Sequence, residues 1–332
     1  MATTPAIITN SISYTYTGPL ATRVLVTPAL ETPEITDIAT PRMVKSKEQL
    51  HWTAQLGKTA VSGSGCGTLT PATGISLTNR QIITDTVQIY FEQCNEQWRG
   101  TVFGDQFAAG TAYDSDRSGD IQEAINQLIR DNLRQEMFRL FSFADTTSAS
   151  ANYNVGFNGL WPTLLASGGD SIFANTAYNT LSSSTIVAEL TKLVNARPAV
   201  MKQMPLDRQK IYVTGNVFEA YVQYLTSQAW NESMLRMENG QLRARFYGID
   251  VVPVYAWDQW IAADSATTGT TNVRMLLTMR ENHVLGYDVA PGNEGFETWF
   301  DPNTRYQKFL TRFQMGYQYI LPDFQVITYG TI

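Results

Sequence analysis

Alternating apolar and polar residues dominate the C-terminal part of the chain. Four segments there are predicted to be strands, Arg274–Met279, Phe296–Asp301, Leu310–Ile320 and Phe324–Tyr329, and the third shows the clearest alternation. Between the last two stands Leu321-Pro322-Asp323, and proline fixes φ and removes a backbone donor. We therefore expect the chain to leave one sheet and enter another at Pro322.

The strongest helical pattern covers Asp120–Phe141. Glu123 follows Asp120 as in a capping box, and Arg134 and Arg139 suit the negative end of the helix macrodipole. At 1.5 Å per residue such a helix spans roughly 33 Å. The apolar residues that recur at helical spacing are Ile121, Ile125, Leu128, Ile129, Leu133, Met137 and Leu140.

Shorter elements follow this helix. Residues 144–183 are rich in Ser, Gly, Asn and Ala, which predicts a loop. Two more helices are expected, the second with Asn216 as its N-cap, together with two strands and a polar loop at 262–272. The predicted helices and strands are Ser184–Asn195, Gln209–Gly215, Asn216–Ser227 and Gly248–Tyr255.

The N-terminal part of the chain has little core of its own. Leu50–Leu56 and Ile75–Ile89 flank the glycine-rich run at 62–67, which predicts a long hairpin with a polar tip. Residues 1–45 are rich in Thr, Pro and Ala. Such a segment lies extended across another surface or forms a partly disordered terminus.

The charge and aromatic content of the chain narrow the classes of function that it could have. The 332-residue chain has a net charge of −6, with 16% charged and 11% aromatic residues. Aromatic residues are enriched and most charges are depleted at the centre of protein–protein interfaces, so we expect extensive protein–protein contact. The acidic balance argues against a broad phosphate-binding surface, which needs clustered Lys and Arg.

Cysteine usage and hydropathy bear on the compartment. Cys66 and Cys94 are too few for the disulfide framework of a secreted domain. The N-terminus has no basic segment followed by an apolar run, and no apolar stretch reaches the ~20 residues of a membrane span. We therefore expect a reduced, soluble protein without a cleaved signal.

Two motifs resemble ligand sites but are incomplete. Gly63-x-Gly65-x-Gly67 fails as a dinucleotide fingerprint because Thr68 stands where glycine is required. Asp114-Ser-Asp-Arg-Ser-Gly119 copies the first half of an EF-hand loop, but Ile125 occupies the position of the bidentate glutamate. We interpret it as a solvated turn whose Ser118 or Asp120 caps the next helix.

The histidines do not suggest a metal site. His51, His283, Cys66 and Cys94 could supply four ligands, but no pair has the close spacing of a structural zinc site. We interpret His283 as an edge or packing histidine.

Hydrolase signals are also incomplete. No G-x-S-x-G elbow occurs, since Ser62 stands where its first glycine should be. Glu294, Glu297 and Asp301 lie close in sequence, as a glycosidase pair could, but carboxylates in a strand–turn region are usually solvated. We assign no catalytic, cofactor-binding or metal-binding residues, and we expect no enzyme.

The order of these elements resembles the HK97-like major capsid proteins of tailed double-stranded DNA bacteriophages. The residues that carry the resemblance are Met279–Tyr287, Phe296–Asn303 and Thr311–Tyr329. The resemblance implies an α+β capsid fold. Its parts are an N-terminal arm (1–45), an extended hairpin or E-loop (46–88), a peripheral domain (89–155) with spine helix 120–141, an axial domain (156–290), return strands of the peripheral domain (291–321) and a final strand returning to the axial domain (322–332).

The resemblance also implies a function. The chain would self-assemble into hexamers and pentamers that form an icosahedral-type shell around double-stranded DNA, without sequence-specific DNA contact, membrane or cofactor. It would assemble in the host bacterial cytoplasm, become part of the virion, and meet portal, scaffolding and decoration proteins. Many members of that family begin with a long, charged, helical scaffolding segment that a protease removes. This chain shows no such segment, so the scaffold is supplied separately or the chain is already trimmed. The initial methionine favours the first of these.

A different class of function stays open from the sequence. A β-rich phage tail or adhesion module could bind carbohydrate through exposed aromatic residues, including Trp257, Trp260 and Trp299.

Overall fold

The computed structural model describes residues 35–53, 77–94, 132, 135–148, 154–166, 172–175, 182–228, 235–238, 241–263, 273–288, 296–301, 303–304 and 306–329. The chain divides into two compact units. The larger consists of Thr32–Val87, Glu136–Glu294 and Arg312–Ile332, and the smaller of Met1–Glu31, Gln88–Gln135 and Gly295–Thr311.

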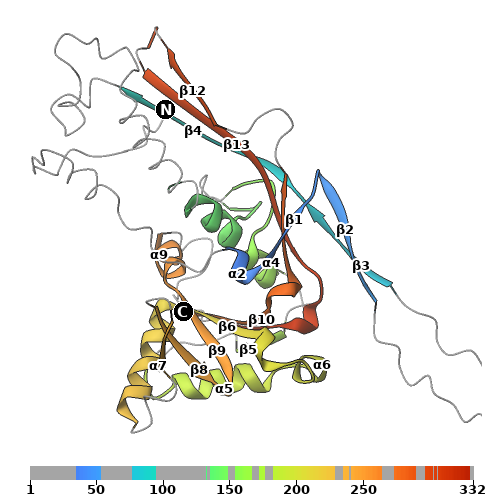
Figure 1. The fold of residues 1–332 in the computed structure, drawn as a ribbon, viewed down its shortest axis with the longest axis vertical. Coiled ribbons are helices and arrows are strands. Elements are labelled where there is room, and N and C mark those ends of the chain that lie inside the picture. The colour runs from blue at the N-terminus through green and yellow to red at the C-terminus, as the bar shows by residue number, and fades with distance from the viewer. Residues whose placement is uncertain are drawn as a thin grey trace, which may run out of the picture. The chain divides into compact units, whose positions relative to one another are not determined.

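Within the described residues, the larger unit is built on a seven-stranded mixed sheet (Figure 1). In spatial order its strands are β5 (Ile172–Asn175), β14 (Gln325–Tyr329), β10 (Arg274–Met279), β6 (Gln209–Thr214), β9 (Ile249–Val254), β8 (Gln241–Phe246) and β7 (Leu235–Glu238). β10 is antiparallel to both of its neighbours, whereas β6 with β9 and β14 with β5 form parallel pairs.

Both faces of this sheet are apolar. Along β6, Ile211 and Val213 point to one face and Tyr212 to the other, and all three are fully buried. The first face packs against α5 (Ile186–Asn195), α6 (Ala199–Lys202) and α7 (Gly215–Ser227). The second face is covered by α2 (Ile35–Ile38), the helix at 135–143, α4 (Leu160–Ala166) and α9 (Tyr255–Ala263).

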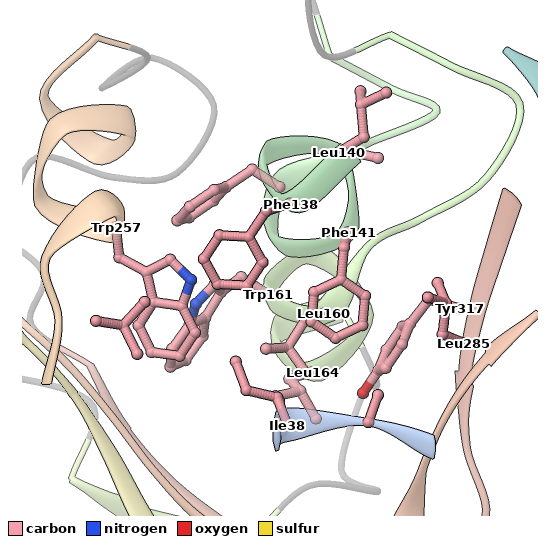
Figure 2. Close-up of a cluster of buried hydrophobic side chains, with 14 of the residues drawn as sticks. Ile38, Phe138, Leu140, Phe141, Leu160, Trp161, Leu164, Trp257, Leu285 and Tyr317 are labelled. Carbon is pink, nitrogen blue, oxygen red and sulfur yellow. The ribbon is translucent and has the colours of Figure 1, made fainter. Parts of the chain in front are cut away.

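Aromatic side chains fill the core on the second face (Figure 2). The Trp161 and Trp257 rings meet edge to face at 5.2 Å, and Trp257 Nε1 donates to Ser142 Oγ at 3.0 Å. Phe141 from the helix at 135–143 packs edge to face on Tyr317 at 5.4 Å. This core therefore joins the helices to both sheets of the larger unit.

A second sheet contains β1 (Thr40–Met43), β11 (His283–Asp288), β13 (Tyr306–Tyr319), β12 (Phe296–Asp301) and β4 (Asp85–Cys94). In the larger unit, β11 lies between β1, which is parallel to it, and the C-terminal half of β13. In the smaller unit, the N-terminal part of β13 pairs with β12. A separate antiparallel pair joins β2 (Lys47–Thr53) to β3 (Leu77–Ile83).

Much of the predicted secondary structure is confirmed. The predicted bounds match those of α5, α7, β6, β9, β10, β12 and β14 closely, and β13 begins earlier than expected. The predicted change of sheet at Pro322 is also confirmed: η5 (Pro322–Phe324) separates β13 in one sheet from β14 in the other.

The loop predicted for 144–183 is wrong in two places, because α4 and β5 lie within it. Pro162 is compatible with α4, because a proline in the first turn of a helix removes a donor that has no partner in the helix. The predicted polar loop at 262–272 begins with the last turn of α9, and its remaining residues lie outside the described part of the chain.

The described end of the predicted long helix is helical from 135 to 143. Its buried face was predicted only in part. Leu140 is buried as expected, but Phe138 and Phe141 are buried beside it, and Met137 is only half-buried. Residues 120–131 lie outside the described part of the chain.

The end of the predicted N-terminal arm belongs to the larger unit. Ile38 and Ala39 are fully buried in the aromatic core, and β1 pairs with β11. The remainder of the predicted arm, 1–34, lies outside the described residues. No helix in the described part of the chain is long and apolar enough to cross a membrane.

We predict that Phe141→Ala lowers the free energy of unfolding by about 3–5 kcal/mol, because it removes a fully buried ring and leaves a cavity. Urea denaturation followed by far-UV circular dichroism measures this loss. Leu206→Ala is the control, since Leu206 is 42% exposed and its loss should change stability by about 0.5 kcal/mol or less. Equal effects of the two substitutions would contradict the packing described here.

Candidate functional site

The base of the predicted hairpin is anchored on the larger unit. β2 and β3 pair in register from Lys47↔Ile83 to Thr53↔Leu77. The Trp52 ring meets Phe324 edge to face at 5.7 Å, and the Arg80 guanidinium lies 4.2 Å from the centre of the Tyr319 ring. Such contacts add specific attraction to simple burial. A small apolar cluster completes the base with Val44, Leu50, Ile82 and Val284.

Two glycines allow this base to cross the second sheet. Gly286 and Gly316 are direct partners in the β11–β13 pair. A Cβ on Gly286 would lie 2.9 Å from Ile82 Cδ1, and a Cβ on Gly316 would overlap the backbone carbonyl oxygen of Ile83. The chain between β3 and β4 therefore runs directly over a pair of positions that carry no side chains.

Two of the chain connections between the two sheets meet at one place, which we call the crossover junction (residues 278–283 and 317–324). One connection runs from β10 through η4 (Arg280–Asn282) to β11, and the other from β13 through η5 to β14. Because β10 pairs with β14 and β11 pairs with β13, the two connections lie side by side.

Asn282 joins these connections by three hydrogen bonds. Its carbonyl oxygen accepts from Ile320 N at 2.9 Å, its side-chain Nδ2 donates to Leu321 O at 2.9 Å, and its Oδ1 accepts from Leu321 N at 2.8 Å. Asn282 is only 3% exposed. A buried amide whose oxygen and nitrogen both face the same neighbouring residue fixes the register of the two connections.

His283 lies inside the junction and is fully buried. Its ring nitrogens lie 2.6 Å from Thr278 Oγ1 and 2.6 Å from Tyr317 Oη. Burial lowers the pKa of His283 to about 3 and raises the pKa of Tyr317 well above its usual value. The packing interpretation of His283 is confirmed, whereas the edge interpretation is wrong because β11 has strands on both sides.

Asp258 is a polar residue that sequence reasoning missed. Its Oδ2 accepts a hydrogen bond from Gly215 N at 2.5 Å, at the start of α7. The predicted cap, Asn216, is wrong: the N-cap position is Thr214, and it makes no side-chain cap bond. Burial raises the pKa of Asp258 to about 6, against the effect of the backbone N–H donors. Asp258 lies on α9, and a local capping signal cannot identify a residue so distant in sequence.

Of the three carboxylates considered for a glycosidase pair, the structure describes the side chain of Asp301 in the smaller unit, and it forms an ion pair. Asp301 Oδ2 lies 2.7 Å from Lys308 Nζ, and Glu92 Oε2 lies 3.9 Å from the same nitrogen. The hydrogen bond from Lys308 holds the pKa of Asp301 down at about 2, so Asp301 stays ionised at neutral pH and has no proton to donate as a general acid. Glu294 and the side chain of Glu297 lie outside the described residues.

Of the three tryptophans suggested for carbohydrate binding, the structure describes the side chains of two. Trp257 is fully buried, and Trp260 packs against Phe138 at 5.3 Å and Phe143 at 6.2 Å. Stacking on a sugar requires an accessible ring face, which Trp257 lacks. The side chain of Trp299 lies outside the described residues.

Of the four candidate zinc ligands named from the sequence, His283 is already engaged in hydrogen bonds in the described structure. His51 is exposed on β2, whereas His283 has both ring nitrogens occupied by hydroxyl groups. Among the described residues, no group of three or more His, Cys, Asp or Glu side chains could hold a metal ion. The glycine run at 63–67, Cys66, the Cys94 side chain and the EF-hand-like run at 114–119 fall outside the described positions.

Comparison with known proteins gives matches at the level of structure alone. No protein-family model matches the sequence, and no curated protein sequence matches it. The chain is similar to one in the capsid of Ralstonia phage GP4, with a TM-score of 0.55, 11% identity, and coverage of 100% of this chain and 99% of that chain. A chain in the capsid of a native GTA particle matches with a TM-score of 0.55 and 11% identity, and the match covers 98% of this chain and 96% of that chain. A chain of Gordonia phage Cozz matches with a TM-score of 0.57 and 10% identity, and the match covers 90% of this chain and 85% of that chain.

The chain has the HK97-like fold of phage capsid proteins. The α+β class expected from the sequence is therefore confirmed. Because sequence identity is so low, the match is one of fold alone.

We predict that Gly316→Ala strongly destabilises this HK97-like fold, by about 3 kcal/mol or more, because the new Cβ meets backbone that cannot rotate away. Gly286→Ala is the matched control, since its Cβ meets methyl groups of the Ile82 and Thr84 side chains rather than backbone and should cost about 1 kcal/mol. Urea unfolding gives both values. Similar losses from both glycines would show that the hairpin base does not cross at Gly316.

We predict that Asp258 makes the protein less stable as pH rises from about 4 to 6. The folded-state pKa of about 6 exceeds the ordinary value of 3.8, so the folded state holds a proton that the unfolded state has lost, and stability declines as that proton leaves. Asp258→Asn keeps an acceptor for Gly215 N and should show a flatter profile in urea midpoints measured from pH 4 to 7. Parallel profiles for the two proteins would contradict this assignment.

Proposed function

We propose that this chain is the major capsid protein of a tailed double-stranded DNA bacteriophage. It self-associates into hexamers and pentamers that close an icosahedral-type shell. The observation that carries the proposal is the fold match to capsid chains over nearly their full lengths. The function is association, and no covalent bond is made or broken.

The hairpin supports this proposal because it is too thin to be stable alone. Within the described residues, β2 and β3 form a sheet of two strands, and an isolated pair is marginal in water. The base is fixed by Trp52 and Arg80. We assign 46–88 as the E-loop, whose outer part gains order by lying on a neighbouring subunit.

The seven-stranded sheet supports the axial-domain assignment. Its strands come from the segment 156–290, with β14 added from the C-terminus. We assign this sheet and its helices to the axial domain, with 322–332 as its returning strand. Residues 89–155, with the spine helix at 120–141, and 291–321 form the peripheral domain. The arm is the part of 1–45 that precedes the buried residues Ile38 and Ala39.

The assembly follows from repeated head-to-tail contacts. A heterologous interface forms a closed ring when its rotation closes, and arms and hairpins that lie on neighbours multiply the contacts per subunit. The net charge of −6 suits a lining that encloses double-stranded DNA without specific contact. Assembly takes place in the host bacterial cytoplasm, with portal, scaffolding and decoration proteins as further partners of the virion.

The first experiment is expression of the chain alone, followed by size exclusion and negative-stain electron microscopy. We expect shells, capsomers or tubes. A discrete monomer or trimer that does not assemble even with a scaffold or crowding agent would overturn the proposal.

Two truncated variants serve as a further check on the same particles. One lacks 1–34, and the other replaces 56–74 by a short Gly-Ser turn while keeping β2 and β3. Both should retain the circular dichroism spectrum of the parent and fail to close shells. Normal particles from both variants would contradict the assignment of these segments to contacts between subunits.

A further inference from the structure

An exposed tyrosine occupies a strained position in the turn between β8 and β9. The turn consists of two residues, Tyr247 and Gly248, because Phe246 pairs directly with Ile249. Their φ angles are positive, 50° and 80°, as this tight type of hairpin turn requires. Glycine adopts such a conformation freely and asparagine does so at low cost, whereas a bulky side chain is strained there. Tyr247 is the only residue other than glycine with a positive φ in the described part of the chain.

The Tyr247 ring projects from the surface and is held in place. Its side chain is 66% exposed, more than any other large apolar side chain among the described residues. The ring meets Phe246 edge to face at 4.8 Å, and Phe246 meets the buried Tyr221 ring at 5.9 Å. Strained residues that the surrounding structure fixes cluster at functional sites. A fixed, exposed aromatic ring is also typical of the centre of a binding surface.

An apolar and mainly basic surface surrounds this ring. The neighbouring element is η3 (Leu206–Arg208), whose Leu206 is 42% exposed. A Cβ on Gly248 would lie 3.4 Å from Leu206 Cδ1, so the turn and η3 are in contact. Arg245 and Asp250 neutralise each other at 2.6 Å, and two basic residues then outnumber one acidic residue. We call the whole set the Tyr247 surface: Leu206, Asp207, Arg208, Lys210, Arg245, Tyr247 and Asp250.

The opposite ends of the same parallel strands carry an acidic surface. β6 and β9 begin beside the Tyr247 surface, and α7 and α9 begin where these two strands end (Figure 1). Tyr255 opens α9 and is 45% exposed, and its ring lies against Gly215. Burial and the nearby charge of Glu219 raise the pKa of Tyr255. α7 and α9 contain Glu219 and Asp258 but no Lys or Arg. We call Tyr255, Glu219 and Asp258 the Tyr255 surface.

We propose that the Tyr247 surface of one subunit docks on the Tyr255 surface of the next, with Arg208 facing Glu219. The partner is a second copy of this chain because the two surfaces carry opposite charges, and complementary charge selects a partner and fixes its register. The surfaces are different parts of the chain, so the contact is heterologous and repeats around a ring. The inference rests on the proposed capsid function and assigns one of its subunit contacts to particular residues of the axial domain.

The contact gives a reason for tyrosine in a turn that suits asparagine. Tyr247→Asn relieves the strain and should raise the urea midpoint of the folded chain. It also removes the ring from the contact and should weaken association by about 30-fold or more, the effect of a hot-spot side chain. Sedimentation velocity over a range of concentrations measures the association. A variant that is more stable and associates as the parent does would contradict the contact.

Cross-linking tests the contact directly. In a full chain whose Cys66 and Cys94 are replaced by serine, Leu206→Cys and Asn216→Cys place a thiol at each surface, and both sites are exposed. A short bismaleimide should join this double variant into a ladder of covalent oligomers on a denaturing gel, because each chain carries both halves of the contact. Either single variant should remain monomeric on the gel, since a head-to-tail contact does not bring two copies of one surface together.

Charge reversal identifies the two partners. Arg208→Glu and Glu219→Arg should each weaken association. The chain with both changes should recover it, because opposite charges face each other again. A mixture of the two single variants should also recover it, since each supplies the surface that matches the other. Glu281→Arg is the matched control: it makes the same change of charge at an exposed position on η4, outside both surfaces, and should associate as the parent does.

The outcomes separate this contact from the capsid function. If the parent forms capsomers or shells but the two-thiol variant gives no ladder, the contact is overturned and the capsid function stands. If the parent stays monomeric and gives no ladder, both are overturned. Equal losses of association from Glu219→Arg and Glu281→Arg would also overturn the contact, because net charge alone would explain them. If Glu219→Arg does not fold by circular dichroism, the cross-linking result decides.

Discussion

The structure of the larger unit depends on a buried polar constraint at the crossover junction. Two segments pass side by side from one sheet to the other, and each must satisfy its backbone groups away from water. Asn282 does this for both by hydrogen bonding to Ile320 and Leu321. Once that register is set, β10 pairs with β14 in one sheet and β11 pairs with β13 in the other. The remaining strands of each sheet then add to these two pairs.

The hairpin base depends on the sheet that this junction positions. Trp52 packs on Phe324 in the connection itself, and Arg80 packs on Tyr319 at the adjoining end of β13. Gly286 and Gly316 then leave room for the chain to pass over. A thin hairpin can extend to a neighbouring subunit only if its base is held, and here aromatic and backbone contacts hold it. In the proposed capsid function, this base would hold the E-loop in position for contact with a neighbouring subunit.

The residues that suggested binding or catalysis have structural roles where the structure describes them. His283 belongs to a buried hydrogen-bond chain, Asp301 is paired with Lys308, and Trp257 is a core residue bonded to Ser142. Perturbed pKa values often mark active sites, but structural networks perturb them too. Among the described residues, burial and hydrogen-bonded ion pairing account for these shifts, and the polar side chains named here fix local geometry.

The sequence by itself determined the local elements and one feature of the topology. Alternation predicted most of β13, and Pro322 predicted the change of sheet, because side-chain period and proline geometry act over a few residues. Only the tertiary structure decided that Gly286 faces Gly316, that Asp258 caps α7, and that Thr278, His283 and Tyr317 form one chain. A side-chain period tells which face a residue occupies, but its partner on that face comes from a distant segment, and no local pattern specifies that partner.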